Sequence, residues 1–244
     1  MLMGVRTILF KIAFVLSIML WATLIIFMIV LPFRWRHRLA TGWGDTVIWL
    51  ARWICGIRWQ IHGREHVPQE AGVMVVNHQS TWETVFTPTM IRDQVWVLKK
   101  ELMYVPFFGW GMALLRPIAI DRSKKKAAME QVIDQGRQRI GMGFWVVMFP
   151  EGTRAKAGEP KPYKHGATRL AVNLGTHILP IVHNAGQFWP KKGRMHPGTV
   201  QVIIGEPIPT VGEDIVALSD RIEAWSHETM QALYQQELAR RGTQ

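Results

Sequence analysis

The hydrophobic and polar positions divide the chain into an apolar N-terminal run and a longer alternating part. Between residues 8 and 31 the sequence is apolar apart from Lys11 and small hydroxyl side chains, and Pro32 follows. A helix of this length crosses a hydrocarbon core of about 30 Å. The run is too long for a typical signal-peptide core, and no small-residue cleavage site follows it. We therefore predict a retained helix that spans a membrane or is deeply embedded in it.

A second helix is indicated after Pro32 by apolar residues at helical spacing, namely Trp43, Val47, Leu50, Ala51 and Ile54. Tryptophans accumulate in the same region, and their rings favour the headgroup layer of a bilayer. Residues 1–56 are therefore expected to form a membrane helix followed by an amphipathic interfacial helix, arranged as a hairpin against one leaflet. The alternative, in which the second helix packs on the core of the following domain, fits the same spacing.

The remainder, residues 57–244, alternates between predicted strands and helices. Short apolar or β-branched runs predict strands at 57–61, 72–76, 94–98, 116–120, 144–149, 178–182 and 200–204. Helical periodicity predicts helices at 81–91, from 123 to about 140, at 167–174 and within 214–240. This alternation predicts an α/β domain with a mixed, mostly parallel sheet that helices cover on both faces.

Charge narrows the choice of partners. The chain has 29 Lys and Arg against 18 Asp and Glu, which gives a net charge of +11. This balance favours a polyanionic neighbour: nucleic acid, an acidic membrane surface or a phosphorylated substrate. The apolar N-terminus favours the last two, and no nucleic-acid recognition motif accompanies the charge. Arg34, Arg36 and Arg38 after the first helix place the following domain in the cytoplasm by the positive-inside bias.

Several chemistries are excluded by residue type or spacing. Cys55 is the single cysteine, which rules out an intramolecular disulfide and a cysteine zinc site, and its apolar surroundings disfavour a nucleophilic thiolate. The chain has no Gly-x-x-x-x-Gly-Lys-Ser/Thr loop, no Gly-x-Ser-x-Gly elbow and no His-Glu-x-x-His zinc helix. Gly63 between His62 and His66 argues against a metal site on one helix face.

One candidate catalytic pair follows the strand predicted at 72–76. His78 lies on the turn after this strand, and Glu83 lies in the first turn of the next helix. A tight turn can bring the two side chains within hydrogen-bond reach, as a general base and its orienting carboxylate require. A second interpretation fits equally well, because Ser80 and Glu83 have the spacing of a helix capping box.

Two further polar groups follow predicted strands. Arg122 comes after the strand at 116–120, and residues 151–154, Glu-Gly-Thr-Arg, come after the strand at 144–149. Ligands of α/β sheets bind beyond the carboxyl ends of the strands, so these residues and His78 can lie in one binding site at that edge of the sheet. Arginine holds phosphate through a planar fork of donors, and glycine allows close approach of the backbone. We therefore predict that Arg122 and Arg154 bind a phosphate-bearing substrate.

Four motifs resemble those of a known family. Residues 77–83 (NHQSTWE), 118–122 (IAIDR), 149–154 (FPEGTR) and 179–181 (LPI) follow the order and approximate spacing of the four blocks of the glycerolipid and lysophospholipid acyltransferases. Residues 163–167 (YKHGA) are similar to the segment that usually follows the third block. The chain thus resembles the PlsC-type 1-acyl-sn-glycerol-3-phosphate acyltransferases from about residue 57 to residue 208, and the hexamer FPEGTR is the most specific part of the match.

The resemblance implies an enzyme of phospholipid biosynthesis in the bacterial cytoplasmic (inner) membrane, with its catalytic domain facing the cytoplasm. It would transfer an acyl group from acyl-CoA or acyl-carrier protein to the 2-hydroxyl of lysophosphatidic acid, giving phosphatidic acid without a cofactor or a metal. By the same resemblance His78 is the general base and Glu83 orients it. The glycerol phosphate is held by Arg122, Glu151, Gly152, Thr153 and Arg154, with Lys164 as a weaker candidate.

One departure from the family pattern concerns the acid of the first block. It is usually aspartate, whereas Glu83 is one methylene longer. Glutamate also occurs here among related acyltransferases, so a different lysolipid acceptor is an alternative. A non-catalytic membrane protein that binds acidic lipids through its basic excess is the alternative from another class.

Overall fold

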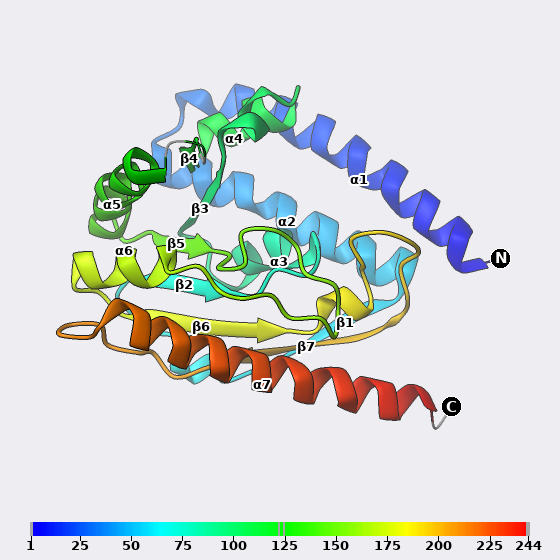
Figure 1. The fold of residues 1–244 in the computed structure, drawn as a ribbon. Coiled ribbons are helices and arrows are strands. Elements are labelled where there is room, and N and C mark those ends of the chain that lie inside the picture. Colours follow the sequence, from blue (N-terminus) through cyan, green and yellow to red (C-terminus); the bar gives the residue numbers. More distant parts are fainter. Residues whose placement is uncertain (1, 122, 124, 243–244) are drawn as a thin grey trace. The chain divides into compact units, whose positions relative to one another are not determined.

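The computed structural model describes residues 2–121, 123 and 125–242 (Figure 1). The α-helices are α1 (Leu2–Phe27), α2 (Phe33–Cys55), α3 (Trp82–Met90), α4 (Phe108–Leu114), α5 (Lys125–Gly141), α6 (Gly166–Leu174) and α7 (Ile215–Gly242). The strands are β1 (Ile57–His62), β2 (Val73–Val76), β3 (Gln94–Lys99), β4 (Ile118–Ile120), β5 (Trp145–Met148), β6 (Ile178–His183) and β7 (Gly198–Ile204). Short 3-10 turns are η1 (Met28–Val30), η2 (Arg64–His66), η3 (Lys100–Tyr104) and η4 (Ala185–Gln187).

The chain divides into two compact units. The first contains Met1–Cys55 with Thr84–Val147, and the second contains Gly56–Glu83 with Met148–Gln244. The first unit therefore holds the two N-terminal helices together with β3, β4, α4 and α5. The predicted division into residues 1–56 and 57–244, a membrane part and a catalytic part, stays a prediction.

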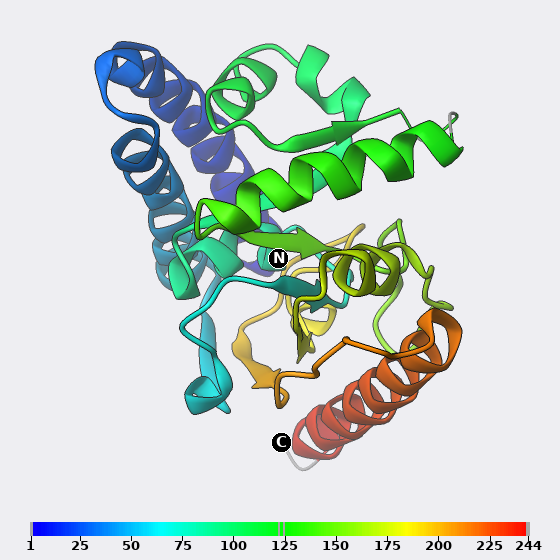
Figure 2. The same cartoon turned by 90° about the vertical axis from the view of Figure 1, so that its left-hand side faces the viewer.

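In the first unit, α1 and α2 pack side by side as a helical hairpin, which both ribbon views show (Figures 1 and 2). The Phe14 and Trp43 rings lie 5.6 Å apart, and the Trp43 indole donates a hydrogen bond to Ser17 Oγ at 3.0 Å. Residues Leu2–Val30 form a helix with a mean hydropathy of 2.7, long and apolar enough to cross a membrane.

The second helix has one buried face and one face with exposed tryptophans, and its contact with a bilayer stays a prediction. Val47 and Ala51 are fully buried, as expected for a helix that packs on a core. Trp49 and Trp53 are 58% and 69% exposed, as expected for the interfacial alternative. The helix is also longer than the spacing predicted, because it begins at Phe33 directly after Pro32, and proline is well tolerated at a helix start.

Part of the basic cluster after α1 has a structural role. Arg34 and Arg38 both bind the Asp93 carboxylate, at 2.9 Å and 2.6 Å, and thereby tie the start of α2 to the segment before β3. Arg36 is buried and donates to the carbonyl groups of Leu114 and Ile29. These arginines therefore hold neighbouring segments together. The membrane orientation predicted from their position after the first helix is a separate expectation.

The strands of the first unit are parallel. β3 pairs with β4 on one side and with β5 on the other, and α5 packs on β4. Trp145, Val146 and Val147 of β5 are buried, as their continuous apolar run predicts for a parallel strand. Cys55 at the end of α2 is also buried, with its thiol against the Arg6 carbonyl oxygen, and burial raises its pKa to about 11.

The second unit combines parallel and antiparallel pairs. β1 pairs with β7 and β2 with β6 in parallel, whereas β6 and β7 run antiparallel. Helix α7 packs on β6 and α6 on β2, and all six residues of β6 are buried. The predicted class, a mixed and mostly parallel sheet flanked by helices, is confirmed. The antiparallel pair follows from the direct connection between β6 and β7, which contains no crossover helix.

Candidate functional site

The predicted base and its orienting acid are brought together in the second unit. β2 is buried along its whole length and ends before Asn77, so His78 lies on the turn that leads into α3. His78 Nδ1 lies 2.7 Å from Glu83 Oε1. The His78 side chain keeps 19% of its surface exposed, whereas the Glu83 side chain keeps 1%. A partly exposed imidazole is thus held by a buried carboxylate.

Glu83 also caps its own helix. Its carboxylate accepts the backbone N–H of Gln79 at 3.0 Å and that of Ser80 at 2.9 Å. Ser80 Oγ in turn accepts the backbone N–H of Trp82 at 3.0 Å. These bonds satisfy donors that a helix start leaves unpaired. Glu83 therefore takes part in both the capping box and the candidate catalytic pair, and the two interpretations do not exclude each other.

The hydrogen bond to Glu83 determines which nitrogen of His78 can act as a base. A carboxylate only accepts hydrogen bonds, so Nδ1 carries the proton and Nε2 keeps its lone pair. The Phe149 ring stacks on the imidazole with a centroid distance of 4.3 Å and an interplanar angle of 23°. The ring of His78 is thereby fixed in both its orientation and its tautomer, which is what a general base requires.

A second histidine, His183, holds the turn that contains Asn77 and His78. His183, at the end of β6, is fully buried and exchanges two bonds with the Asn77 amide: Nδ2 donates to the His183 carbonyl at 3.0 Å, and Oδ1 accepts the His183 N–H at 2.9 Å. His183 Nδ1 accepts the Ala185 N–H, so Nε2 carries the proton that is donated to the Asn77 carbonyl at 2.9 Å. The same Nε2 lies 3.7 Å from Glu83 Oε2. Burial lowers the pKa of His183, in keeping with this neutral form.

The Glu-Gly-Thr-Arg turn is bound to the backbone of the base. Glu151 Oε1 accepts the backbone N–H of His78 at 2.9 Å, and the backbone N–H of Ala155 donates to the His78 carbonyl at 2.7 Å. Gly152 adopts φ +71°, a conformation that side-chain-bearing residues rarely adopt. Hydrogen bonds therefore connect the turn that carries His78 to the turn at 151–154, and both turns belong to the second unit.

Glu151 lies in surroundings that favour its neutral form. Its carboxyl group is buried, and within the described part of the chain Oε2 has no hydrogen-bond partner. Burial, and to a smaller extent the nearby Glu83 carboxylate, raise the pKa of Glu151 to about 7. The hydrogen bond from His78 and the charge of Lys161 oppose this shift and are weaker.

Replacement of Glu151 by glutamine should stabilise the protein at pH 8. Because the folded protein holds the proton up to about pH 7 and the unfolded chain releases it near 4.5, the free energy of unfolding falls as pH rises between these values. The full difference is on the order of 3 kcal/mol. Glu151→Gln keeps an acceptor for the His78 N–H and removes this loss, so its Tm advantage should appear between pH 5 and 8. Equal pH dependence of Tm in Glu151→Gln and the control Glu228→Gln, which alters an exposed glutamate, would contradict the assignment.

Basic side chains lie around the same turn. Arg154 Nη1 donates to Thr81 Oγ1 at 2.9 Å, directly beside the loop that carries His78. Lys161 Nζ donates to Thr153 Oγ1 at 3.1 Å and to the Arg154 carbonyl at 3.2 Å. Lys164 is exposed, and its backbone N–H donates to the Pro150 carbonyl. Arg122 lies outside the described residues.

Sequence reasoning missed the contributions of Lys161 and of the Phe149 ring, and it held His183 only as a possible supporting residue. Lys161 belongs to no motif, and only its sequence proximity to the turn at 151–154 could have drawn attention to it. Phe149 belongs to the motif at 149–154, but nothing in the sequence indicates that its ring stacks on His78. His183 was recognisable as a histidine that ends a buried strand, but its bonds to Asn77 join residues far apart in the sequence, so no local pattern predicts them.

Comparison with known proteins finds similar sequences over most of the chain. The Acyltransferase family matches residues 58–184. The chain is 47% identical over 233 residues to a 1-acyl-sn-glycerol-3-phosphate acyltransferase of Pseudomonas aeruginosa, an alignment that covers 93% of this chain and 91% of that protein. It is 33% identical over 180 residues to 1-acyl-sn-glycerol-3-phosphate acyltransferase alpha of Mus musculus, which covers 70% of this chain and 63% of that protein.

A solved structure has a similar fold. The crystal structure of the 1-acyl-sn-glycerophosphate (LPA) acyltransferase PlsC from Thermotoga maritima matches with a TM-score of 0.76 over 95% of this chain and 97% of that one. The sequences are 21% identical, so this likeness concerns the fold.

Proposed function

We propose a reaction for this chain on the premise that it belongs to the PlsC-type family of glycerolipid acyltransferases. The chain transfers a fatty acyl group to the 2-hydroxyl of 1-acyl-glycerol-3-phosphate and forms phosphatidic acid. The observation that carries this proposal is the pair of His78 and Glu83, preassembled at 2.7 Å beside the turn that contains Arg154.

The chemistry follows from the tautomer of His78. Nε2 takes the proton of the acceptor hydroxyl as its oxygen attacks the thioester carbonyl, and a tetrahedral intermediate forms. The C–S bond then breaks, and the imidazolium returns the proton to the departing thiolate. Glu83 stabilises the imidazolium while it exists, because its buried carboxylate already accepts a hydrogen bond from Nδ1–H. No acyl-enzyme, metal or cofactor takes part.

We assign the phosphate of the acceptor to the part of the site that contains the basic side chains. Arg154 and Lys161 supply positive charge next to the turn at 151–154. Gly152 and Thr153 shape this turn, and Glu151 holds it to the backbone of His78. Arg122 completes the phosphate contacts by the resemblance of residues 118–122 to the second block of the family, and Lys164 is a further candidate.

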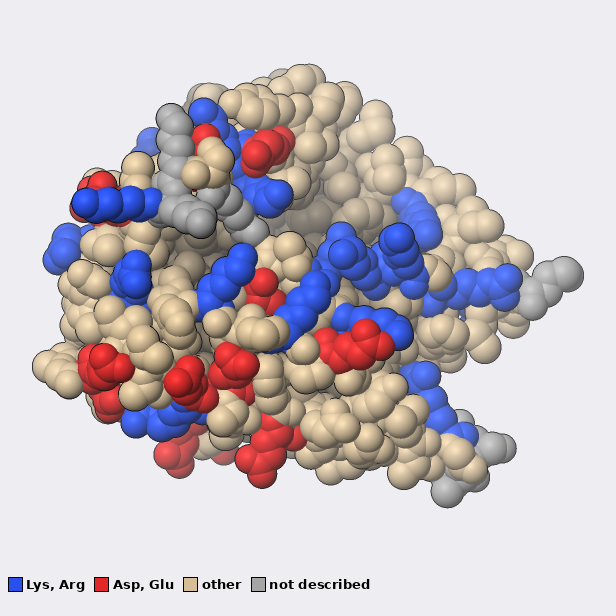
Figure 3. All heavy atoms as spheres, viewed as in Figure 1, with Lys and Arg blue, Asp and Glu red and all other residues tan. Residues whose placement is uncertain are grey.

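The donor is proposed to be acyl-CoA or acyl-carrier protein, and the site of action the cytoplasmic face of the bacterial inner membrane. Both donors carry phosphate, and acidic lipids line the membrane surface. Lys and Arg are spread over much of the face in Figure 3, whereas acidic side chains gather mainly over the first half of α7. Such a surface attracts anionic donors and membranes.

The test is a competition between acceptors. Purified protein in detergent receives an acyl donor and an equimolar mixture of 1-acyl-glycerol-3-phosphate, other lysophospholipids and 1-acylglycerol, and mass spectrometry identifies the products. We expect phosphatidic acid to dominate. Arg154→Ala should lower its formation by roughly 10-fold to 100-fold, because a charged hydrogen bond to phosphate is lost, while transfer to 1-acylglycerol changes little.

The matched control is Arg169→Ala, which removes an exposed arginine from α6 outside the site. Preference for another lysolipid would replace the proposed acceptor. Lipid binding without turnover of any acyl donor would instead favour a non-catalytic lipid-binding protein.

A further inference from the structure

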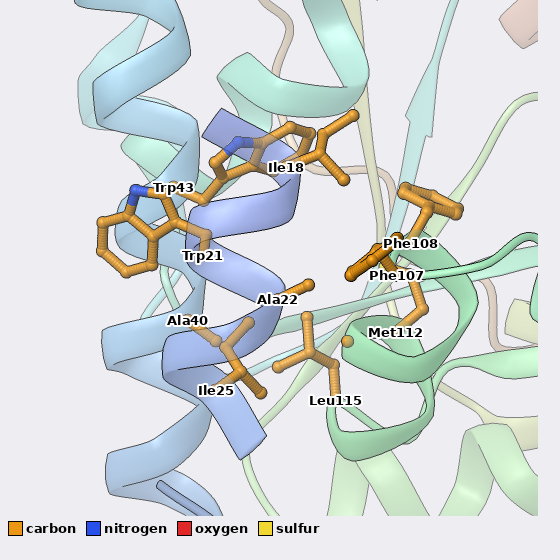
Figure 4. A pocket seen from close by; sticks show the side chains of 11 residues that line it. Ile18, Trp21, Ala22, Ile25, Ala40, Trp43, Phe107, Phe108, Met112 and Leu115 are labelled. Carbon is orange, nitrogen blue, oxygen red and sulfur yellow. The ribbon is translucent and has the colours of Figure 1, made fainter. Parts of the chain in front are cut away.

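The segment formed by η3 and α4, residues 100–114, is apolar on two sides. On its inner side, Phe107, Phe108 and Met112 line a small pocket of about 50 Å³ together with side chains of α1 and α2 (Figure 4). Phe107 adopts φ +60°, which is strained for a residue with a side chain. Packing of its ring in the pocket offsets that strain.

The inner side attaches the segment to the most apolar helix of the chain. Gly111 is buried against α1, where a Cβ added to it would lie 3.7 Å from Ala22 Cβ and 3.8 Å from Ile25 Cδ1. Figure 4 shows Ala22 and Ile25 of α1 facing Met112 and Leu115 across the pocket. The segment therefore lies alongside α1, the helix with the length and hydropathy of a membrane span.

The outer side is apolar although it faces away from the protein. Leu102 and Val105 are 41% and 44% exposed, and Tyr104 and Trp110 are 70% and 54% exposed. Exposed apolar side chains that gather on one surface are typical of a site that contacts another protein or a membrane. Tyr and Trp combine an apolar ring with a polar tip, which suits the headgroup layer of a bilayer.

The charged residues beside this side fit the same environment. Lys99 and Lys100 are exposed next to the apolar residues of η3, and Glu101, which is also exposed, separates them from Leu102, so the three side chains carry a net positive charge. Lysines at this boundary are placed to reach phosphate groups of anionic lipids while the neighbouring apolar side chains lie deeper.

We propose that the η3–α4 segment is a second membrane-contacting element, seated in the headgroup layer of an anionic bilayer next to α1. This inference rests on the proposed membrane association of α1. It adds that residues in the middle of the chain, after β3, enter the lipid surface. The bilayer is the occupant because the segment packs on α1, whose own exposed side chains are largely apolar, and because two exposed lysines adjoin the exposed apolar side chains.

Site-specific labelling of the full chain in lipid vesicles tests this placement. Cys55→Ala removes the single cysteine, and Val105→Cys and Val211→Cys then introduce matched labelling sites in separate proteins. Val211 lies in the loop before α7 and is 80% exposed. Leu20→Cys, on the exposed face of α1, reports the membrane contact of α1 itself. Each protein carries an environment-sensitive NBD fluorophore in vesicles of phosphatidylglycerol and phosphatidylethanolamine.

We expect the fluorophore at position 105 to shift to the blue and to be quenched at least several-fold more by nitroxide-labelled lipids than the fluorophore at position 211. Aqueous iodide should show the opposite order. If position 20 is quenched by lipid nitroxide and position 105 behaves like position 211, the inference is overturned and the role of α1 stands. If position 20 also remains in water, both the inference and the membrane association of α1 are overturned. Acyl-transfer activity in detergent is independent of either result.

Discussion

Replacement of His78 by alanine is expected to lower kcat for acyl transfer by about 10²-fold to 10⁴-fold, the usual contribution of a general base. The substituted protein lacks Nε2, the group assigned to the proton of the acceptor hydroxyl. The fold should persist, because the backbone bonds of His78 to Glu151 and Ala155 do not need its side chain. Formation of phosphatidic acid from a radiolabelled acyl donor measures the loss over this range.

His62→Ala provides the matched control for this substitution. His62 is an exposed histidine at the end of β1 that bonds the Gln201 side chain, outside the site. We expect unchanged kcat for this variant. Activity of His78→Ala equal to that of the control would refute the assignment of the base.

Glu83→Gln should be almost as damaging, with a loss in kcat of up to about 10⁴-fold, as for an orienting acid whose replacement selects the wrong histidine tautomer. His78 Nδ1 and the Gln79 N–H lie against Oε1 of the carboxylate, whereas the Ser80 N–H is within hydrogen-bond distance of both oxygens, at 2.9 Å from Oε1 and 3.1 Å from Oε2. An amide has only one acceptor oxygen to put in these two places. The amide nitrogen would then face a donor. We also expect a lower Tm, because α3 loses part of its cap.

Glu83→Asp separates the orienting role from the capping role. Its carboxylate retains the charge but is one methylene shorter, so it is expected to lose activity to a smaller extent than Glu83→Gln. Measuring kcat against pH distinguishes the two effects, since the loss of the base's partner changes the pH profile, whereas a weaker cap changes only Tm. Full kcat in Glu83→Gln would rule out Glu83 as the orienting acid.

Much of the fold was predictable from local patterns. Each strand predicted from a short apolar run is present, because such runs are stable mainly when buried in a sheet. The starts of α3 and α2 were also predictable, because Ser80 accepts the Trp82 N–H as a capping residue does and Pro32 directly precedes α2. The contact between His78 and Glu83 was also predictable, because a turn and a helix start leave few positions for two side chains five residues apart.

Other features depend on contacts between distant residues. The antiparallel pairing of β6 and β7 follows from how the connecting loop returns, which hydrophobic spacing does not encode. The bonds from Asn77 to His183 and from Glu151 to the backbone of His78 cross long stretches of sequence. The pKa of Glu151 is raised mainly by its burial in the folded protein. The motif shows only that a glutamate is present, and it does not indicate that the neutral form is favoured.

The burial of Cys55 has a consequence for the chemistry proposed here. Each transfer releases a thiol from the donor, either coenzyme A or the prosthetic arm of a carrier protein. The protein offers that thiol no accessible partner, because its single cysteine is buried against the Arg6 carbonyl and its raised pKa keeps it protonated. Mixed disulfides between enzyme and product are thus disfavoured under oxidative conditions, and alkylating agents directed at thiols have no exposed target on this chain.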